Sequence, residues 1–91
     1  MSPNEVKIWK ALETDPSRWI TSQEIANAAE VAARTARAYM ARFDRLGYVE
    51  HVEVFPGHRF RLVSGSEGVE ERRRIVNRAA KVLGLIQKGH G

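Results

Sequence analysis

Apolar residues recur at helical spacing in four stretches of the chain, which predicts four helices. Ser2 and Thr21 are expected to cap the first two helices, because each is followed three residues later by a glutamate, Glu5 or Glu24, that can complete a capping box. Gly47 stands where a left-handed residue would end the third helix. The predicted helices cover residues 2–15, 21–30, 33–46 and 69–87.

Two short runs between the third and fourth helices alternate between apolar and polar residues, as strands do. They cover residues 49–55 and 59–62, and Pro56-Gly57 between them predicts a turn. Phe60 and Leu62 are expected to face inward. Trp19-Ile20 predicts one further β-like rung before the second helix. The order helix, rung, helix, helix, hairpin, helix predicts an α+β fold.

Length and composition limit the classes of protein that fit. A chain of 91 residues predicts one domain with a small core, and a partner subunit is a common remedy for a core of this size. The absence of cysteine excludes disulfides and thiol chemistry. No run of about 18 apolar residues and no secretory signal is found, so we expect a cytoplasmic protein without membrane contact.

The net charge of +4 is unevenly distributed along the chain. Residues 1–30 carry a net charge of −2, whereas residues 31–63 and 64–91 each carry +3. Arginine outnumbers lysine 11 to 4, and its planar fork suits phosphates and guanine edges. The distribution favours a polyanion as partner, and a merely solvated basic surface is the alternative.

The middle of the chain contains a series of short motifs in a fixed order. Glu24-Ile25-Ala26 is followed by a tight turn, then by Thr35-Ala36-Arg37, the core positions Met40 and Phe43, Gly47-Tyr48-Val49, and the run GHRFRLV. In this order the motifs resemble a winged helix-turn-helix DNA-binding domain. The sequence departs from that family at the turn, where Glu30 replaces the frequent glycine and Ala32 replaces a capping Ser or Thr.

The resemblance implies a winged helix-turn-helix of three helices and a hairpin wing over residues 1–63. A linker over 64–68 and an added C-terminal helix over 69–91 would follow. The implied function is sequence-specific binding of double-stranded DNA by a small transcriptional regulator, or by a regulator of plasmid or phage maintenance. A winged-helix protein–protein interaction module is the competing class. RNA binding is a third, although no aromatic stacking platform is evident.

Projection of the third helix separates a core face from an arginine-rich face. Ala36, Met40 and Phe43 define the core face, and the opposite face alternates arginine with alanine, which would let the helix enter a major groove. A solvated amphipathic helix is the alternative interpretation. The residues expected to read bases are Arg34, Thr35, Arg37 and Ala38, and those expected to contact the DNA backbone are Ser22, Arg42 and Arg45.

The tip of the hairpin is the second predicted DNA contact. His58, Arg59 and Arg61 are placed to meet the DNA backbone or minor groove, and a plain turn with solvated charges is the alternative. Phe55 is expected either to stand exposed at the tip or to fold back on the core.

The last helix is more apolar than a surface helix requires, which predicts a homodimer. One small domain reads few base pairs, and two-fold pairing doubles the number read. The alternative is that this helix only closes its own core. The arginines Arg72, Arg73, Arg74 and Arg78 are expected to form a solvated face rather than a second DNA contact. The predicted dimer stripe consists of Val69, Val76, Ala79, Leu83 and Ile86.

No catalytic or metal-binding pattern is found in the sequence. His51, His58 and His90 lack metal-ligand spacing, the serines stand in caps and turns, and no glycine-rich phosphate loop occurs. We therefore expect a non-enzymatic protein without cofactors. Its expected partners are double-stranded DNA and a second copy of the chain, with no small-molecule ligand.

Overall fold

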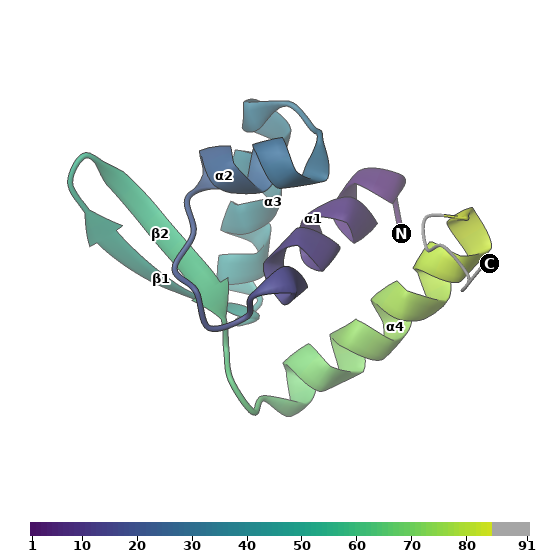
Figure 1. Cartoon of the computed structure of the whole chain (residues 1–91). Helices are drawn as coiled ribbons and strands as arrows, with labels where there is room; N and C mark the ends of the chain where they lie inside the picture. Colours follow the sequence, from purple (N-terminus) through teal and green to yellow (C-terminus); the bar gives the residue numbers. More distant parts are fainter. Residues whose placement is uncertain (85–91) are drawn as a thin grey trace.

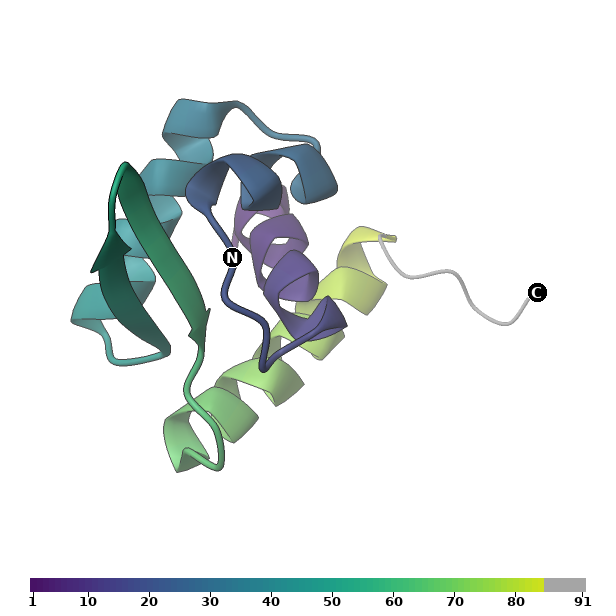
Figure 2. The same cartoon turned by 60° about the vertical axis from the view of Figure 1, so that its left-hand side comes forward.

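The computed structural model describes residues 1–84 and has an α+β architecture in which four helices accompany one antiparallel hairpin (Figure 1). The predicted element order is confirmed. Helix α1 runs through the middle of the molecule, with α2 on one side and α4 on the other in both views (Figures 1 and 2). The elements are α1 Pro3–Thr14, α2 Ser22–Ala29, α3 Ala33–Arg45, β1 Val49–Val54, β2 Gly57–Leu62 and α4 Glu67–Leu83.

The predicted capping box is present at α2 but not at α1. At α2 the Thr21 N–H donates to Glu24 Oε1 over 2.9 Å, and the Glu24 N–H donates to Thr21 Oγ1 over 3.1 Å. At α1 the Ser2 hydroxyl accepts from the Glu5 N–H, as predicted. The Glu5 carboxylate is buried, however, and it pairs with Arg72 on α4. The capping-box prediction for Glu5 is therefore wrong, because an ionic partner on another helix takes its carboxylate.

The turn between α2 and α3 is built on Glu30 in place of glycine. Glu30 has φ 58° and ψ 48°, which is the left-handed conformation that non-glycine residues rarely adopt. Its N–H is satisfied by the carbonyls that end α2, those of Ala26 and Asn27. Ala32 precedes α3 without a side-chain cap. Both departures from the family pattern thus keep a tight turn, at the cost of backbone strain and an uncapped helix.

An isolated antiparallel β-bridge joins strand β2 of the hairpin to the segment that precedes α2. Ile20 and Phe60 exchange two backbone hydrogen bonds of 2.8 Å each, which confirms the rung predicted at Trp19-Ile20. Phe60 and Leu62 are buried as predicted. Phe55 at the tip is 95% exposed, so of the two alternatives for this residue the exposed one holds.

The core gathers side chains from every helix and from the hairpin. Trp9 of α1 lies edge-on to Phe43 of α3, with ring centroids 5.5 Å apart, and edge-on to Tyr48, with centroids 5.6 Å apart. Val76 of α4 is fully buried in the same cluster. Helix α4 is therefore part of this core and is not a detached tail.

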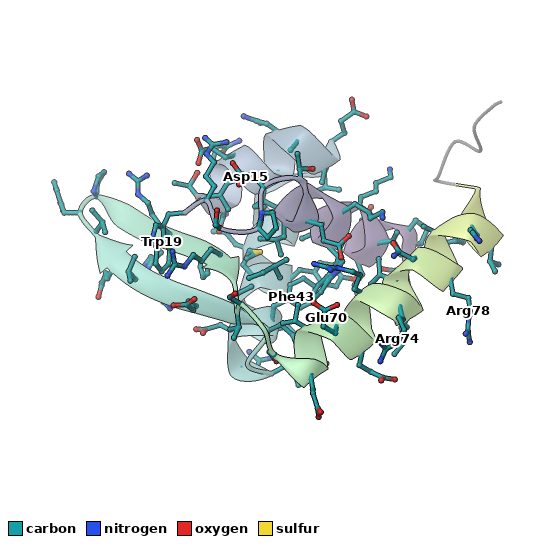
Figure 3. The ribbon with its side chains drawn as sticks, turned by 60° about the horizontal axis from the view of Figure 1, so that its bottom comes forward. Asp15, Trp19, Phe43, Glu70, Arg74 and Arg78 are labelled. Carbon is teal, nitrogen blue, oxygen red and sulfur yellow. The ribbon has the colours of Figure 1, made fainter. Side chains whose placement is uncertain are left out.

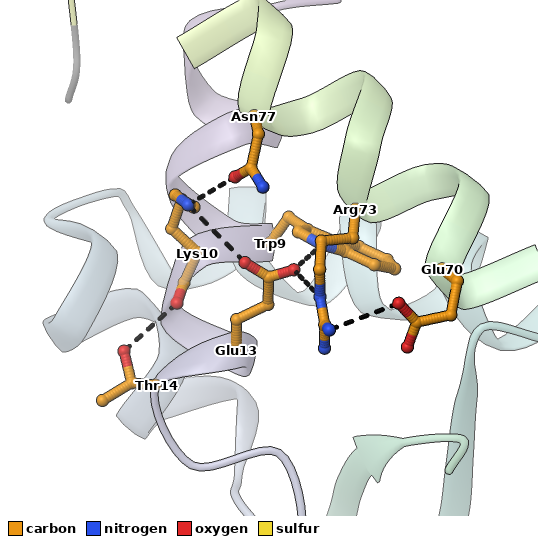
Figure 4. A network of polar contacts seen from close by, with 7 residues as sticks. All are labelled: Trp9, Lys10, Glu13, Thr14, Glu70, Arg73 and Asn77. Atoms are coloured by element: carbon orange, nitrogen blue, oxygen red, sulfur yellow. Dashed lines mark hydrogen bonds and ion pairs between the residues drawn. The ribbon is translucent and has the colours of Figure 1, made fainter. Parts of the chain in front are cut away.

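A polar network sets the orientation of α4 against α1 (Figure 4). The Glu13 carboxylate accepts hydrogen bonds from Trp9 Nε1 at 2.9 Å and from Arg73 Nε at 2.8 Å. Lys10 Nζ donates to Asn77 Oδ1 over 2.6 Å. Because these bonds tie two turns of α4 to α1, they decide which face of α4 is left to solvent.

The boundaries of α4 differ from those predicted at both ends. The helix begins at Glu67, where the Ser66 hydroxyl caps it, two residues before the predicted start. It ends at Leu83, because Gly84 takes a left-handed conformation with φ 71°. The predicted extension to residue 87 lies outside the described residues.

Candidate nucleic-acid interface

The outward face of α3 carries arginines separated by small residues. The three predicted core residues of this helix, Ala36, Met40 and Phe43, are fully buried, so the opposite face is turned to solvent. Alanine on that face leaves the helix backbone accessible between the longer side chains. The exposed residues of this face are Arg34, Arg37, Ala38, Ala41 and Arg45.

The arginines of this face differ from most others in the chain by having no ionic partner. Within residues 1–84, no carboxylate lies within 4.0 Å of the guanidinium of Arg34, Arg37, Arg45, Arg59 or Arg78. The other six arginines all form ion pairs. Three of the five unneutralised guanidiniums therefore stand on one helix face, and a fourth stands on the hairpin beside it.

Thr35 and Arg42 occupy one flank of the same helix. Thr35 is half-buried, and Arg42 is held by the body of the protein. The Arg42 guanidinium lies 5.4 Å from the centre of the Tyr39 ring and 3.9 Å from the Glu5 carboxylate. Its side chain is still half exposed, so it is positioned without being covered. Ser22, the first residue of α2, is half-buried.

The three predicted hairpin contacts are in different environments. Arg61 is engaged twice, by Glu50 at 3.2 Å and by the Trp19 ring, whose centre is 4.3 Å from its guanidinium carbon. Arg59 shares this face of β2, since alternate residues of a strand point the same way. Within residues 1–84 it has neither an ionic partner nor an aromatic ring beneath it. His58 lies on the other face. The guanidinium of Arg59 is therefore available to an external anion, whereas that of Arg61 holds Trp19 against the hairpin.

The sequence analysis did not anticipate a cluster of Asp44, His51 and His58. His51 Nδ1 lies 3.1 Å from Asp44 Oδ2, and His51 Nε2 lies 2.7 Å from His58 Nδ1. The His51 ring also stacks on Phe60. The hairpin register was the signal that could have revealed the contact, because His51 and His58 come to one face across the turn. The cluster fixes the hairpin to the end of α3.

No metal site results from this cluster. A group of three or more His, Cys, Asp or Glu side chains arranged to hold a metal ion is absent from the part of the chain that the structure describes.

Electrostatics connect the hairpin with α2. The hydrogen bond from the Thr21 N–H is the main cause that lowers the pKa of Glu24, and the positive charges of Arg18 and Arg59 lower it further. Arg59 thus stands close enough to the start of α2 for its charge to be felt there. The start of α2 and strand β2 of the hairpin therefore lie near each other.

The predicted dimer stripe is largely taken up by the chain's own core. Val69 and Val76 are buried against the rest of the molecule, and Ala79 is half-buried beside them. Leu83 is 40% exposed, and Ile86 lies outside the described residues. The reason is the polar network on α1, which turns this side of α4 inward. Arg72 and Arg73 of the predicted solvated face turn toward α1 as well, and only Arg74 and Arg78 remain exposed.

None of the helices in residues 1–84 combines the length and apolar character needed to cross a lipid bilayer. Comparison with known proteins finds no family model, no curated protein and no solved structure that matches this chain.

Proposed function

We propose that the chain is a winged helix-turn-helix protein that binds double-stranded DNA in a sequence-specific manner, with α3 as recognition helix and the hairpin as wing. The observation that carries the proposal is the face of α3, where arginines without ionic partners stand between exposed alanines. Elsewhere in residues 1–84 the chain neutralises most of its arginines, so leaving this group unpaired favours an external anion.

The arrangement supports a division of roles along α3. The small side chains Ala38 and Ala41 allow the helix to lie deep in a major groove, where Arg34 and Arg37 can reach base edges. Arg42 and Arg45 lie in the second half of the helix, which would run beside the phosphates of the DNA backbone. Ser22 stands at the start of α2 and contributes a further phosphate contact. Thr35, on the flank of α3, completes the proposed base-reading set.

The wing adds a backbone contact, chiefly through Arg59. His58 and Arg61 should contribute less to DNA binding, because each side chain already has a partner within the chain. The biological role that fits is a small cytoplasmic regulator of transcription, or of plasmid or phage maintenance, that acts as a homodimer.

Binding of the full chain to a mixed-sequence duplex, measured by fluorescence anisotropy at several salt concentrations, tests the proposal. Neutralising about five phosphates per protomer gives a slope of about −4 to −5 when log affinity is plotted against log salt concentration. The triple variant R34A/R37A/R45A should bind much more weakly and with a shallower slope.

The controls separate the competing classes. Duplex RNA of the same sequence, measured in parallel, should bind more weakly, because its major groove is too narrow for a helix. No binding to duplex DNA at low salt would overturn the proposal and favour a protein–protein interaction module. Equal binding of RNA and DNA would also contradict sequence reading in a major groove.

A further inference from the structure

One face of α4 is apolar and uncovered, and it differs from the stripe predicted from the sequence. Val82 is 81% exposed and Ile75 is 43% exposed, although both lie on a helix whose opposite side is buried. Met1, 46% exposed, borders the same surface. Together these side chains line a shallow groove of ≈ 380 Å³, formed by Met1, Ile75, Arg78, Ala79, Val82 and Leu83.

Gly68 lies on the same line of the helix, one heptad before Ile75 and two before Val82. Glycine inside a helix is less favourable than alanine, so it needs a reason. Neither the backbone conformation nor crowding within the described chain requires glycine at this position. Its φ is not positive, and an added Cβ would meet Ser66 Oγ at 3.5 Å and Tyr48 Cε1 at 3.8 Å, which are ordinary contacts. The missing side chain is explained if another chain approaches closely at this point.

The charges of α4 are separated along its length. On its exposed side the helix carries Glu67 and Glu71 in its first two turns, followed by Arg74 and Arg78. Arg72 and Arg73, which also lie in the first half, turn toward α1. Figure 3 shows Arg74 and Arg78 pointing away from the rest of the molecule, whereas Glu70 lies toward it. A second α4 that runs antiparallel would set each acidic half against a basic half. A parallel partner would oppose like charges.

We infer that the exposed face of α4 binds the α4 helix of a second copy of this chain, antiparallel and around a two-fold axis. With Ile75 on the axis, Val82 of one copy lies over Gly68 of the other, where the absent side chain leaves room. The same register places Glu71 beside Arg78 of the partner copy. The inference deepens the proposed homodimer and rests on it, and it replaces the predicted seam with Gly68, Ile75 and Val82.

Sedimentation of the full chain without DNA tests the interface directly. The wild-type chain should sediment as a dimer at tens of micromolar. Val82→Glu should raise the dimer dissociation constant by roughly 100-fold, because it sets an unpaired carboxylate against the acidic half of the partner helix. Val82 is mostly exposed in a single chain, so circular dichroism of the variant should report an unchanged fold.

Charge exchange tests the antiparallel register. Glu71→Arg and Arg78→Glu each turn two symmetric attractions into repulsions and should each weaken the dimer by about tenfold. The double variant E71R/R78E should return to within about threefold of wild type, since the two charges only change places. Glu70→Arg is the matched control. It makes the same charge change and loses the same kind of pair, with Arg73 instead of Arg74, but it lies off the interface.

The outcomes that overturn the inference are distinct from those that overturn DNA binding. A wild-type chain that stays monomeric at about 100 μM excludes the interface, even if the same chain binds duplex DNA. A dimer that Val82→Glu leaves intact uses another surface. A dimer weakened by Val82→Glu but unaffected by either single charge variant is not antiparallel in this register. A wild-type chain that forms this dimer but does not bind duplex DNA would instead refute the proposed function alone.

Discussion

The carboxylate of Glu5, in the first turn of α1, is paired with the guanidinium of Arg72 on α4. Both side chains are largely covered, with 9% and 19% of their surfaces exposed. Arg72 also lies over the Tyr48 ring, and its Nε has no hydrogen-bond partner within residues 1–84. Burial lowers the pKa of Arg72. The arginine therefore depends on Glu5 to compensate for its removal from water.

Removing Glu5 alone should be strongly destabilising. Glu5→Ala leaves the covered guanidinium of Arg72 without its counter-charge, and we expect the free energy of unfolding in urea to fall by about 3 kcal/mol. The double variant E5L/R72M should lose less than Glu5→Ala, because apolar side chains can replace both members of a covered pair. E5L and R72M should also be measured singly. If their two losses of unfolding free energy add up to the loss of the double variant, the two residues do not interact.

Arg34→Ala and Arg37→Ala should each weaken binding to a specific site more than binding to random duplex DNA. A base-reading arginine contributes about 1–3 kcal/mol of discrimination. Competition binding after selection of a preferred site from random DNA measures both affinities. Arg74→Ala, an exposed arginine on α4, is the matched control and should change neither. Equal losses of specific and non-specific affinity would reassign Arg34 and Arg37 to phosphates.

Arg59→Ala should weaken DNA binding about uniformly across sequences. A single lost phosphate contact makes the slope of log affinity against log salt shallower by roughly one unit. Arg61→Ala should instead lower the stability of the fold, since Arg61 is held by Glu50 and Trp19. An unchanged slope for Arg59→Ala would place the wing away from DNA.

Glu30→Gly should stabilise the protein by about 0.5–1 kcal/mol. A left-handed conformation is strained for any residue with a Cβ and costs glycine little, although glycine is also more flexible when unfolded. Thermal unfolding measures the change. Glu30→Ala is the control, because it removes the carboxylate but keeps the Cβ and should give no such gain. Equal stability of the two variants would show that charge, and not backbone strain, governs this position.

Glu24 should make the stability of the fold depend on pH under acidic conditions. Its pKa is lowered in the folded protein, chiefly by the hydrogen bond from Thr21, so its charged form stabilises the fold above the ordinary value of 4.5. This contribution is lost as the pH falls through the lowered pKa. The difference in unfolding free energy between wild type and Glu24→Gln should therefore be present at neutral pH and shrink in acid. A difference independent of pH would contradict this account.

The order of elements was predictable from the sequence because local signals agree with the final packing. Caps and Asp15-Pro16 mark boundaries that depend on neighbouring residues only. The turn predicted at Pro56-Gly57 lies one residue earlier, at Phe55-Pro56, because Gly57 already pairs with Val54 as the first residue of β2. The core face of α3 follows from helical spacing for the same reason. Once the core face is known, the arginines on the opposite side of α3 are predicted to point outward.

Contacts between distant segments could not be obtained in this way. The sequence assigned Glu5 to its own helix cap, because nothing local indicates that Arg72 lies opposite. Periodicity showed that α4 is apolar on a wide sector but not which half of it faces α1. That choice depends on Glu13, Lys10 and their partners on α4, which are contacts across more than half the chain. The contact of His51 with Asp44 likewise requires the hairpin to be docked on α3.

Glu5 touches two helices at once, since Arg42 of α3 lies 3.9 Å from one carboxylate oxygen and Arg72 of α4 pairs with the other. Together with the shared core, this leaves no hinge between the helix proposed to read DNA and the helix proposed to join two copies. In such a dimer the α3 helices of the two copies would lie at a fixed distance from each other. The operator would then be an inverted repeat that tolerates only one distance between its halves, because the joint that could absorb an extra base pair is missing.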